Sequence, residues 1–175
     1  AVKLVRRGLD SEDVLRRFEQ AATSQPTLVI SMADRLAGLM RSADDPFGTR
    51  ALAWLDSVAL PDAATTLARD LARARVLASM ERWTESIDTV DAVLARDKNS
   101  ASALKLRAEV LSWAGRHGEA LAAYDSYLAV QPRDVDARRQ QARVAGWGGQ
   151  YGTSKRLYGA LQADFPNDAR IAAEF

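Results

Sequence analysis

Few side chains in this 175-residue sequence belong to the types that perform chemistry. His117 is the single histidine, and the chain contains no cysteine. A histidine pair for a metal, a thiolate nucleophile, a disulfide and a Ser-His-Asp set therefore have no support. We interpret His117 as a packing residue, because a lone histidine with no partner for acid–base work has no defensible catalytic role.

A glycine-rich stretch from Gly146 to Gly152 could suggest a loop that binds phosphate. It lacks the Gly-Lys-Ser/Thr ending of such loops, and no strand is expected before it. We predict a loosened turn between two helices instead.

Paired carboxylates, which hydrolyse glycosides in some enzymes, occur at Asp44-Asp45 and at Asp88 and Asp91. Ordinary surface charges surround both pairs, so we interpret them as solvated. The residues thus predict a protein that is not an enzyme and that needs no cofactor and no metal.

Composition limits the classes of partner. The chain is 47% hydrophobic, which suits one globular domain. Its formal net charge of +1 produces no large electrostatic field that would attract nucleic acid or a membrane surface. The longest apolar runs fall far short of the ~20 residues of a membrane-spanning helix, and charged residues interrupt residues 1–15, where a signal peptide would need an apolar core. We therefore expect no transmembrane segment and no nucleic-acid partner.

A pattern that occurs three times, at a spacing of 34 residues, must position these side chains. The aligned units are residues 67–100, 101–134 and 135–168. The sets that recur between units are Arg73-Ala74 with Arg107-Ala108, Arg82-x-x-Glu85 with Arg116-x-x-Glu119, and Trp113 with Trp147. A fixed period of this length predicts one helical unit stacked on itself as a solenoid.

Each unit reads as two helices. In the middle unit, apolar residues at helical spacing predict a first helix that ends near Gly115 and a second from Gly118 to about Val130. Gly115 suits the left-handed conformation after a helix, and Pro132 prevents the second helix from continuing. Asp134 is placed to cap the next helix. Small residues at Ala108, Ala120 and Ala142 predict close approach of the helices.

These units resemble the tetratricopeptide repeat family, whose pattern is a small residue, Gly, an aromatic residue, Ala, an aromatic residue and Pro. The second unit matches at Ala108, Gly115, Ala120, Tyr124 and Pro132, with His117 in place of the first aromatic residue. The third matches at Ala142, Gly149, Tyr151, Tyr158 and Pro166, with Ser154 for Ala. The first is weaker and departs at Glu81, Ser86, Val90 and Lys98. The resemblance implies an all-α, right-handed superhelical solenoid of antiparallel helix hairpins.

The flanking residues fit the pattern less well. Residues 1–66 predict a helix from Asp10 or Ser11 to about Ala22, then helices over about 27–41 and 49–60. The last two could form one degenerate hairpin with Ala51 and Leu55 facing inward. Residues 169–175 predict the start of a further repeat or a capping helix, so we expect the chain to be a segment of a longer protein.

The resemblance also implies a groove, because the first helix of each hairpin lines the concave face in this family. The residues placed there as a hypothetical partner-binding groove are Arg75, Lys105, Glu109, Ser112, Trp113, Arg139, Arg143 and Trp147. The four basic residues would form a broken ridge able to bind carboxylates or phosphates. The alternative is that they are solvated and paired with nearby acids. For Trp113 and Trp147 we favour packing at the hairpin ends over a flat surface for a peptide or a sugar ring.

The resemblance predicts a non-catalytic scaffold that binds a protein or an extended peptide segment. Glu109 and Arg143 stand where the chaperone-binding members have Asn, so binding of chaperone tails is not expected. The Trp-Ala/Gly-Gly turns and the closing Gln-Pro or Phe-Pro are similar to periplasmic repeats of bacterial outer-membrane proteins that export exopolysaccharide. Two alternatives stay open: a cytoplasmic assembly or regulatory adaptor, and direct binding of an anionic polymer or polysaccharide along the groove.

Overall fold

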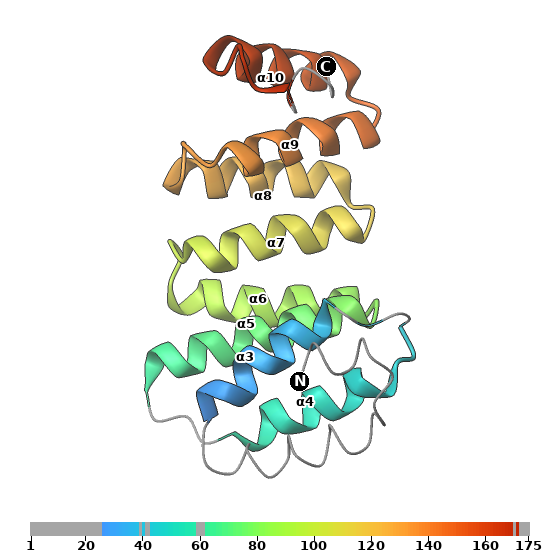
Figure 1. Cartoon of the computed structure of the whole chain (residues 1–175), viewed down its shortest axis with the longest axis vertical. Coiled ribbons are helices and arrows are strands. Elements are labelled where there is room, and N and C mark those ends of the chain that lie inside the picture. The colour runs from blue at the N-terminus through green and yellow to red at the C-terminus, as the bar shows by residue number, and fades with distance from the viewer. Residues whose placement is uncertain (1–25, 39, 41–42, 59–61, 170, 172–175) are drawn as a thin grey trace. The chain divides into compact units, whose positions relative to one another are not determined.

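Every regular element in the described part of this computed structural model is an α-helix (Figure 1). The structure describes residues 26–38, 40, 43–58, 62–169 and 171. The helices are α3 (Pro26–Ala37), α4 (Pro46–Ser57), α5 (Ala63–Ser79), α6 (Trp83–Arg96), α7 (Ala101–Trp113), α8 (His117–Val130), α9 (Val135–Trp147) and α10 (Tyr151–Asp164). The predicted all-α class of consecutive helix hairpins is confirmed. The helix predicted from Asp10 or Ser11 to Ala22 lies outside the described residues.

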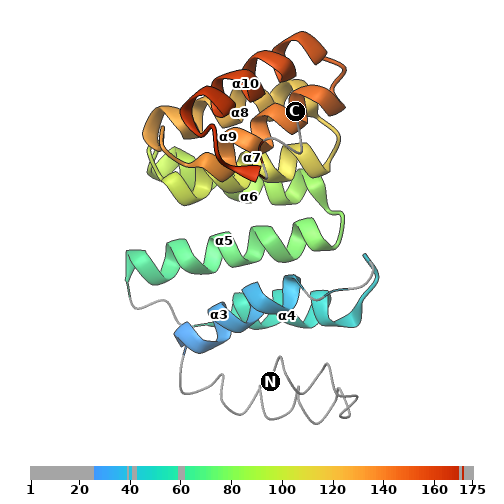
Figure 2. The ribbon, with the colours of Figure 1, turned by 45° about the horizontal axis from the view of Figure 1, so that its top comes forward.

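The chain consists of two compact units, residues 1–89 and 90–175, with the boundary inside α6. In the first unit, α3, α4 and α5 pack against one another (Figure 2). Their shared core includes Ile30, Leu55 and Val76, and Ala51 and Leu55 are buried, as the predicted hairpin of α3 and α4 requires.

The bounds of these two helices correct the prediction. Pro46 begins α4 instead of separating it from α3, because proline suits the first helical turn, where no backbone donor is needed. The carboxylate of Asp45 accepts a hydrogen bond from the Phe47 amide at 3.0 Å and caps the helix. The helix therefore covers Pro46–Ser57 and not residues 49–60, and α3 ends at Ala37 rather than near residue 41.

In the second unit, α7 packs against α8, α8 against α9 and α9 against α10. Ala108, Ala120 and Ala142 have no exposed surface, which confirms their predicted place where helices approach closely. Tyr158 and Leu161 of α10 share a core with Ala142 and with Ile171, which follows α10. Among the residues predicted to begin a further repeat, Ile171 is helical and buried.

The turns within the hairpins have one geometry at the 34-residue spacing. The backbone is left-handed at Glu81 (φ 57°), Gly115 (φ 73°) and Gly149 (φ 74°). In each turn the following amide donates to a carbonyl five residues earlier, at 2.8–2.9 Å: Arg82 to Leu77, Arg116 to Leu111 and Gln150 to Ala145. This is the hydrogen-bond pattern of a Schellman helix end. The glycine-rich stretch is thus the end of α9, a turn and the start of α10, as predicted.

In two hairpins, the serine that replaces alanine on the second helix forms a hydrogen bond to the first helix. The Ser86 hydroxyl donates to the Ala74 carbonyl at 2.7 Å, and the Ser154 hydroxyl donates to the Ala142 carbonyl at 2.8 Å. Ala120 holds the same position in the middle hairpin. The departures from the family pattern at Ser86 and Ser154 therefore supply a hydrogen bond between the two helices of a hairpin.

Candidate interaction surface

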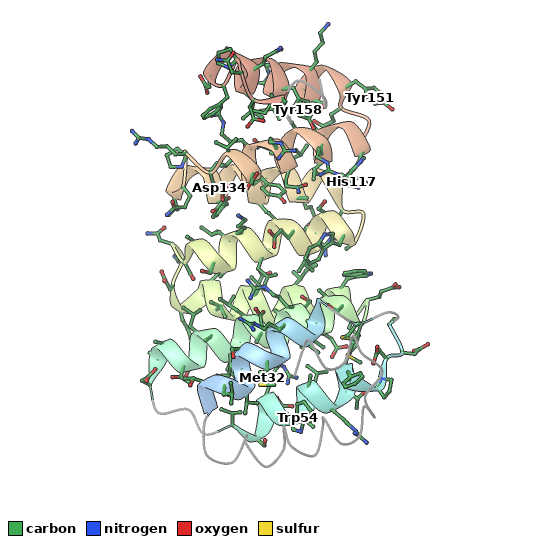
Figure 3. The ribbon with its side chains drawn as sticks, viewed as in Figure 1. Met32, Trp54, His117, Asp134, Tyr151 and Tyr158 are labelled. Carbon is green, nitrogen blue, oxygen red and sulfur yellow. The ribbon has the colours of Figure 1, made fainter. Side chains whose placement is uncertain are left out.

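The hairpin turns of the second unit bring aromatic residues to one end of its helices. Trp113 ends α7, His117 begins α8, Trp147 ends α9 and Tyr151 begins α10. We call these four residues the aromatic edge. Figure 3 places His117 and Tyr151 at this end and Asp134 at the opposite end. The three-residue turns are short, so the end of one helix and the start of the next must lie close together.

Both tryptophans are more solvent-exposed than the sequence led us to expect. Trp113 is 55% exposed and Trp147 is 54% exposed, so more than half of each residue is open to solvent, although the Trp147 ring also packs against His117 and Arg143. Tyr151 is 75% exposed. Large exposed aromatic side chains that lie together at one end of a fold are typical of contact surfaces.

His117 packs inside this edge, as predicted. Its ring centroid lies 6.4 Å from that of Trp147, with the planes at 50°. A Cβ atom added to Gly148 would lie 2.9 Å from the Cβ atom of His117, a separation that real Cβ atoms essentially never show. Gly148 is thus required for the close approach of the α9–α10 turn to the start of α8.

Arg143 lies one helical turn before Trp147, with its guanidinium carbon 5.1 Å from the centre of the tryptophan ring. The cation and the ring face attract each other, and the contact keeps the exposed guanidinium at the edge. Arg139 differs. Its side chain is only 16% exposed, and its guanidinium pairs with Asp136 at 3.3 Å.

Lys105 is held at the opposite end of the helices. Its ammonium donates to the Asp134 carboxylate at 2.8 Å, and the Tyr127 hydroxyl donates to the same oxygen at 2.7 Å. The other Asp134 oxygen accepts from the Ala137 amide at 2.9 Å, which confirms the predicted cap of α9.

These contacts shift the pKa values of the three side chains. Burial acts to raise the pKa of Asp134, but the hydrogen bonds from Lys105, Tyr127 and the Ala137 amide outweigh it and lower that pKa to about 2. The hydrogen bond to Asp134 raises the pKa of Lys105 against the opposing effect of burial. Burial and the bond to Asp134 raise the pKa of Tyr127. Lys105 therefore links α7 to the start of α9, and its charge is already paired with the Asp134 carboxylate.

The remaining predicted groove residues do not add to the edge. Arg75 belongs to the first unit, where it pairs with Asp34 at 2.7 Å. Ser112 is buried, and Glu109 is partly buried. Of the eight predicted residues, the structure brings Trp113, Trp147 and Arg143 to the turn end of the second unit, while Lys105 and Arg139 are held by carboxylates.

Sequence reasoning missed Tyr151 and Lys155 as surface residues of this edge. The repeat pattern explains Tyr151 only as an aromatic position of the family, and exposed Lys155 follows it by one helical turn. The spacing of four residues in both Arg143–Trp147 and Tyr151–Lys155 could have shown them, since residues four apart lie on the same helix face.

The described residues offer little for other chemistry. No three His, Asp or Glu side chains among them come together as a metal site. Of the acidic pairs, Asp45 caps α4 and Asp91 accepts from Arg107 at 2.7 Å, while Asp44 and Asp88 are exposed. None of the described helices is both long and apolar enough to span a membrane. A shallow depression of about 640 Å³ lined by residues 164–169 lies at the far end of α10 from Tyr151.

Comparisons with known proteins find the fold among solved structures. No protein-family model and no curated protein matches the chain. The crystal structure of PilW, described as a widely conserved type IV pilus biogenesis factor, matches with 17% identity and a TM-score of 0.74, over 98% of this chain and 78% of PilW. MamA 41-end from Desulfovibrio magneticus RS-1 matches with 17% identity and a TM-score of 0.66, over 95% of this chain and 92% of MamA. A MamA RS-1 double mutant gives a TM-score of 0.64 with the same identity and coverage. These proteins contain tetratricopeptide repeats, and at this identity the likeness concerns the fold: the chain is an α solenoid similar to theirs.

Proposed function

We propose that this protein is a non-catalytic scaffold that binds a partner protein through the aromatic edge of its second unit. The observation that carries the proposal is the exposure of Trp113 and Trp147, which hold the same repeat position and are each more than half exposed. Burying two such side chains on a partner removes a large apolar area from water, which favours association.

The surroundings of the two tryptophans suit a protein partner. Tryptophan, tyrosine and arginine are the residue types that most often dominate the binding energy of protein interfaces. The aromatic edge contains Trp113, Trp147 and Tyr151, and Arg143 lies beside it on the Trp147 ring. The three-residue turns that carry them are fixed by helix-end hydrogen bonds, so little conformational freedom is lost on binding.

Partner capture by cross-linking of the full-length protein in its own cells tests the proposal. We expect Trp113→Ala/Trp147→Ala to lose the partners that the wild type captures, because each Trp→Ala change removes an anchor that is more than half exposed. Arg133→Gln is the control, since Arg133 is exposed in the α8–α9 turn at the opposite end. Equal capture by the double variant and the wild type would exclude the aromatic edge as the binding surface.

We propose that this scaffold works in the bacterial periplasm as part of a polysaccharide-export assembly. The support is the similarity of its Trp-Ala/Gly-Gly turns and closing Gln-Pro and Phe-Pro to repeats of that kind. Fractionation of the source cells should find the full-length protein in the periplasm, and deletion of its gene should reduce exported polysaccharide. A cytoplasmic location would favour an assembly or regulatory adaptor instead.

A further inference from the structure

Two pairs of one cation and one aromatic ring flank the turn between α9 and α10. On the α9 side, Arg143 lies over the ring of Trp147 at 5.1 Å. On the α10 side, Lys155 follows Tyr151 by four residues, a spacing that places both on one helix face, and both are exposed. The equivalent of Arg143 on α7 is Glu109. Within the second unit, this concentration of positive charge therefore belongs to the hairpin of α9 and α10 and not to that of α7 and α8.

Arg143 and Lys155 differ from four arginines of the second unit, whereas exposed Arg156 beside Lys155 resembles Arg143 and Lys155 in forming no ion pair with a described residue. Neighbouring arginines in the second unit are held by carboxylates at 2.6–3.3 Å, namely Arg107 by Asp91, Arg116 by Glu119, Arg138 by Asp164 and Arg139 by Asp136. Arg143 lies over the Trp147 ring, and among the described residues neither Arg143 nor Lys155 forms an ion pair. The turn end of α9 and α10 thus carries positive charge that is not held in an ion pair within the described part of the chain.

We propose that this edge docks an extended acidic segment of the partner protein. The inference rests on the proposed function and names the chemistry that the same surface recognises. A carboxylate of the segment forms a bidentate pair with the guanidinium of Arg143, and Lys155 attracts a second acidic residue. Apolar side chains of the segment lie on Trp113 and Trp147.

Geometry supports an extended occupant. Trp113 and Trp147 come from successive hairpins, so a strand-like segment that crosses both turns meets them one after the other. The contact with Trp147 already restricts the Arg143 side chain, which lowers the entropy lost when a carboxylate binds. A neutral sugar would stack on the tryptophans but would leave the charges of Arg143 and Lys155 unused.

A random dodecapeptide library displayed on phage, selected on the intact chain, tests this chemistry directly. We expect the enriched peptides to combine Asp or Glu with large apolar residues. For a synthetic copy of the best peptide, Arg143→Gln should weaken binding about 10-fold or more, as loss of a charged hydrogen bond does. Arg143→Lys should recover only part of this loss, because lysine lacks the planar fork. Arg133→Gln is the matched control for loss of one exposed charge, and it should leave the affinity unchanged.

Two further measurements separate the contributions. Replacing the acidic residues of the peptide by Gln and Asn should cost at least as much as Arg143→Gln, and affinity for the acidic form should fall with added salt. Trp113→Ala should weaken binding while leaving the Arg143 contact with Trp147 in place, so it reports on the apolar part of the surface. Circular dichroism of each variant verifies folding.

The outcomes distinguish this inference from the proposed function. Loss of binding in Trp113→Ala with full affinity in Arg143→Gln would keep the scaffold and overturn the acidic partner. Enrichment of basic or uncharged peptides would overturn it in the same way. If no peptide is enriched, or if neither variant changes binding, both proposals fail. Tryptophan fluorescence quenched by oligouronates but not by peptides would assign the surface to an acidic polysaccharide.

Discussion

At the scale of the residue, three turns share one hydrogen-bond pattern, and their left-handed position holds glycine in two of them and glutamate in the third. Glu81 has a φ of 57°, whereas the equivalent residues Gly115 and Gly149 have φ values of 73° and 74°. The left-handed region costs a residue with a Cβ atom roughly 1 kcal/mol relative to glycine. The turn between α5 and α6 therefore carries backbone strain that the α7–α8 and α9–α10 turns avoid.

We expect Glu81→Gly to raise the free energy of unfolding by about 0.5–1 kcal/mol, since it removes this strain and Glu81 is exposed. The midpoint of urea denaturation measures the change. Gly115→Ala, the reciprocal change at the equivalent position, should destabilise by a similar amount. A lower midpoint for Glu81→Gly would show that the glutamate side chain stabilises the turn by another contact.

The close approach of Gly148 to His117 gives a second prediction at this scale. We expect Gly148→Ala to cost about 1–3 kcal/mol, because its Cβ atom would lie 2.9 Å from the Cβ atom of His117 and the turn would have to move. Gly159→Ala is the matched control: nothing lies within 4 Å of a Cβ atom there, and alanine is favoured inside a helix, so stability should rise. Thermal denaturation measures both, and equal effects would contradict the close contact.

At the scale of the element, Asp134 joins three helices through one side chain. It caps α9, and it accepts hydrogen bonds from Lys105 of α7 and Tyr127 of α8. The lowered pKa of Asp134 means that the folded state holds the carboxylate ionised more strongly than the unfolded chain does. This stabilisation is fully present above the usual pKa of 3.8 and is lost as the pH falls toward 2.

We expect Asp134→Asn to lower the free energy of unfolding by about 2 kcal/mol at pH 7, the equivalent of the shift in pKa. Asparagine keeps the cap of α9 but removes the charge that binds Lys105. The difference from wild type should shrink between pH 4 and pH 2, as urea denaturation at several pH values would show. Asp88→Asn, at an exposed position, is the control. A difference that is constant over this range would contradict the role of the charge.

At the scale of the whole molecule, a solenoid is stabilised by contacts within a hairpin and between neighbours, so stability varies along the chain. We expect Leu161→Ala and Leu111→Ala each to cost about 2–5 kcal/mol, because both side chains are buried. Hydrogen exchange should show the loss for Leu161→Ala concentrated in α9 and α10, with α7 and α8 still protected. Leu111→Ala should reduce protection in α7 and α8. Equal loss throughout the second unit for both variants would indicate one cooperative block instead.

Much of this architecture was predictable because it is local. The 34-residue period, Gly115 and Gly149 at the turns and Asp134 at the cap all act through nearby backbone, so sequence spacing alone locates them. The predicted start of α4 is wrong because Pro46 can either end a helix or begin one, and the Asp45 cap decides between the two.

The sequence by itself determined the helical hairpins, their turns and the residue types at the turn ends. Only the tertiary structure decided which of those residues are available to a partner. Lys105 and Arg75 were expected on a basic ridge, but their carboxylate partners lie 29 and 41 residues away in the sequence and meet them only after folding. Arg143 has no such partner within the described residues and lies on Trp147. The spacing of Trp113 and Trp147 showed that they share a position, whereas only folding decided that His117 packs against the Trp147 ring and that more than half of each tryptophan stays exposed.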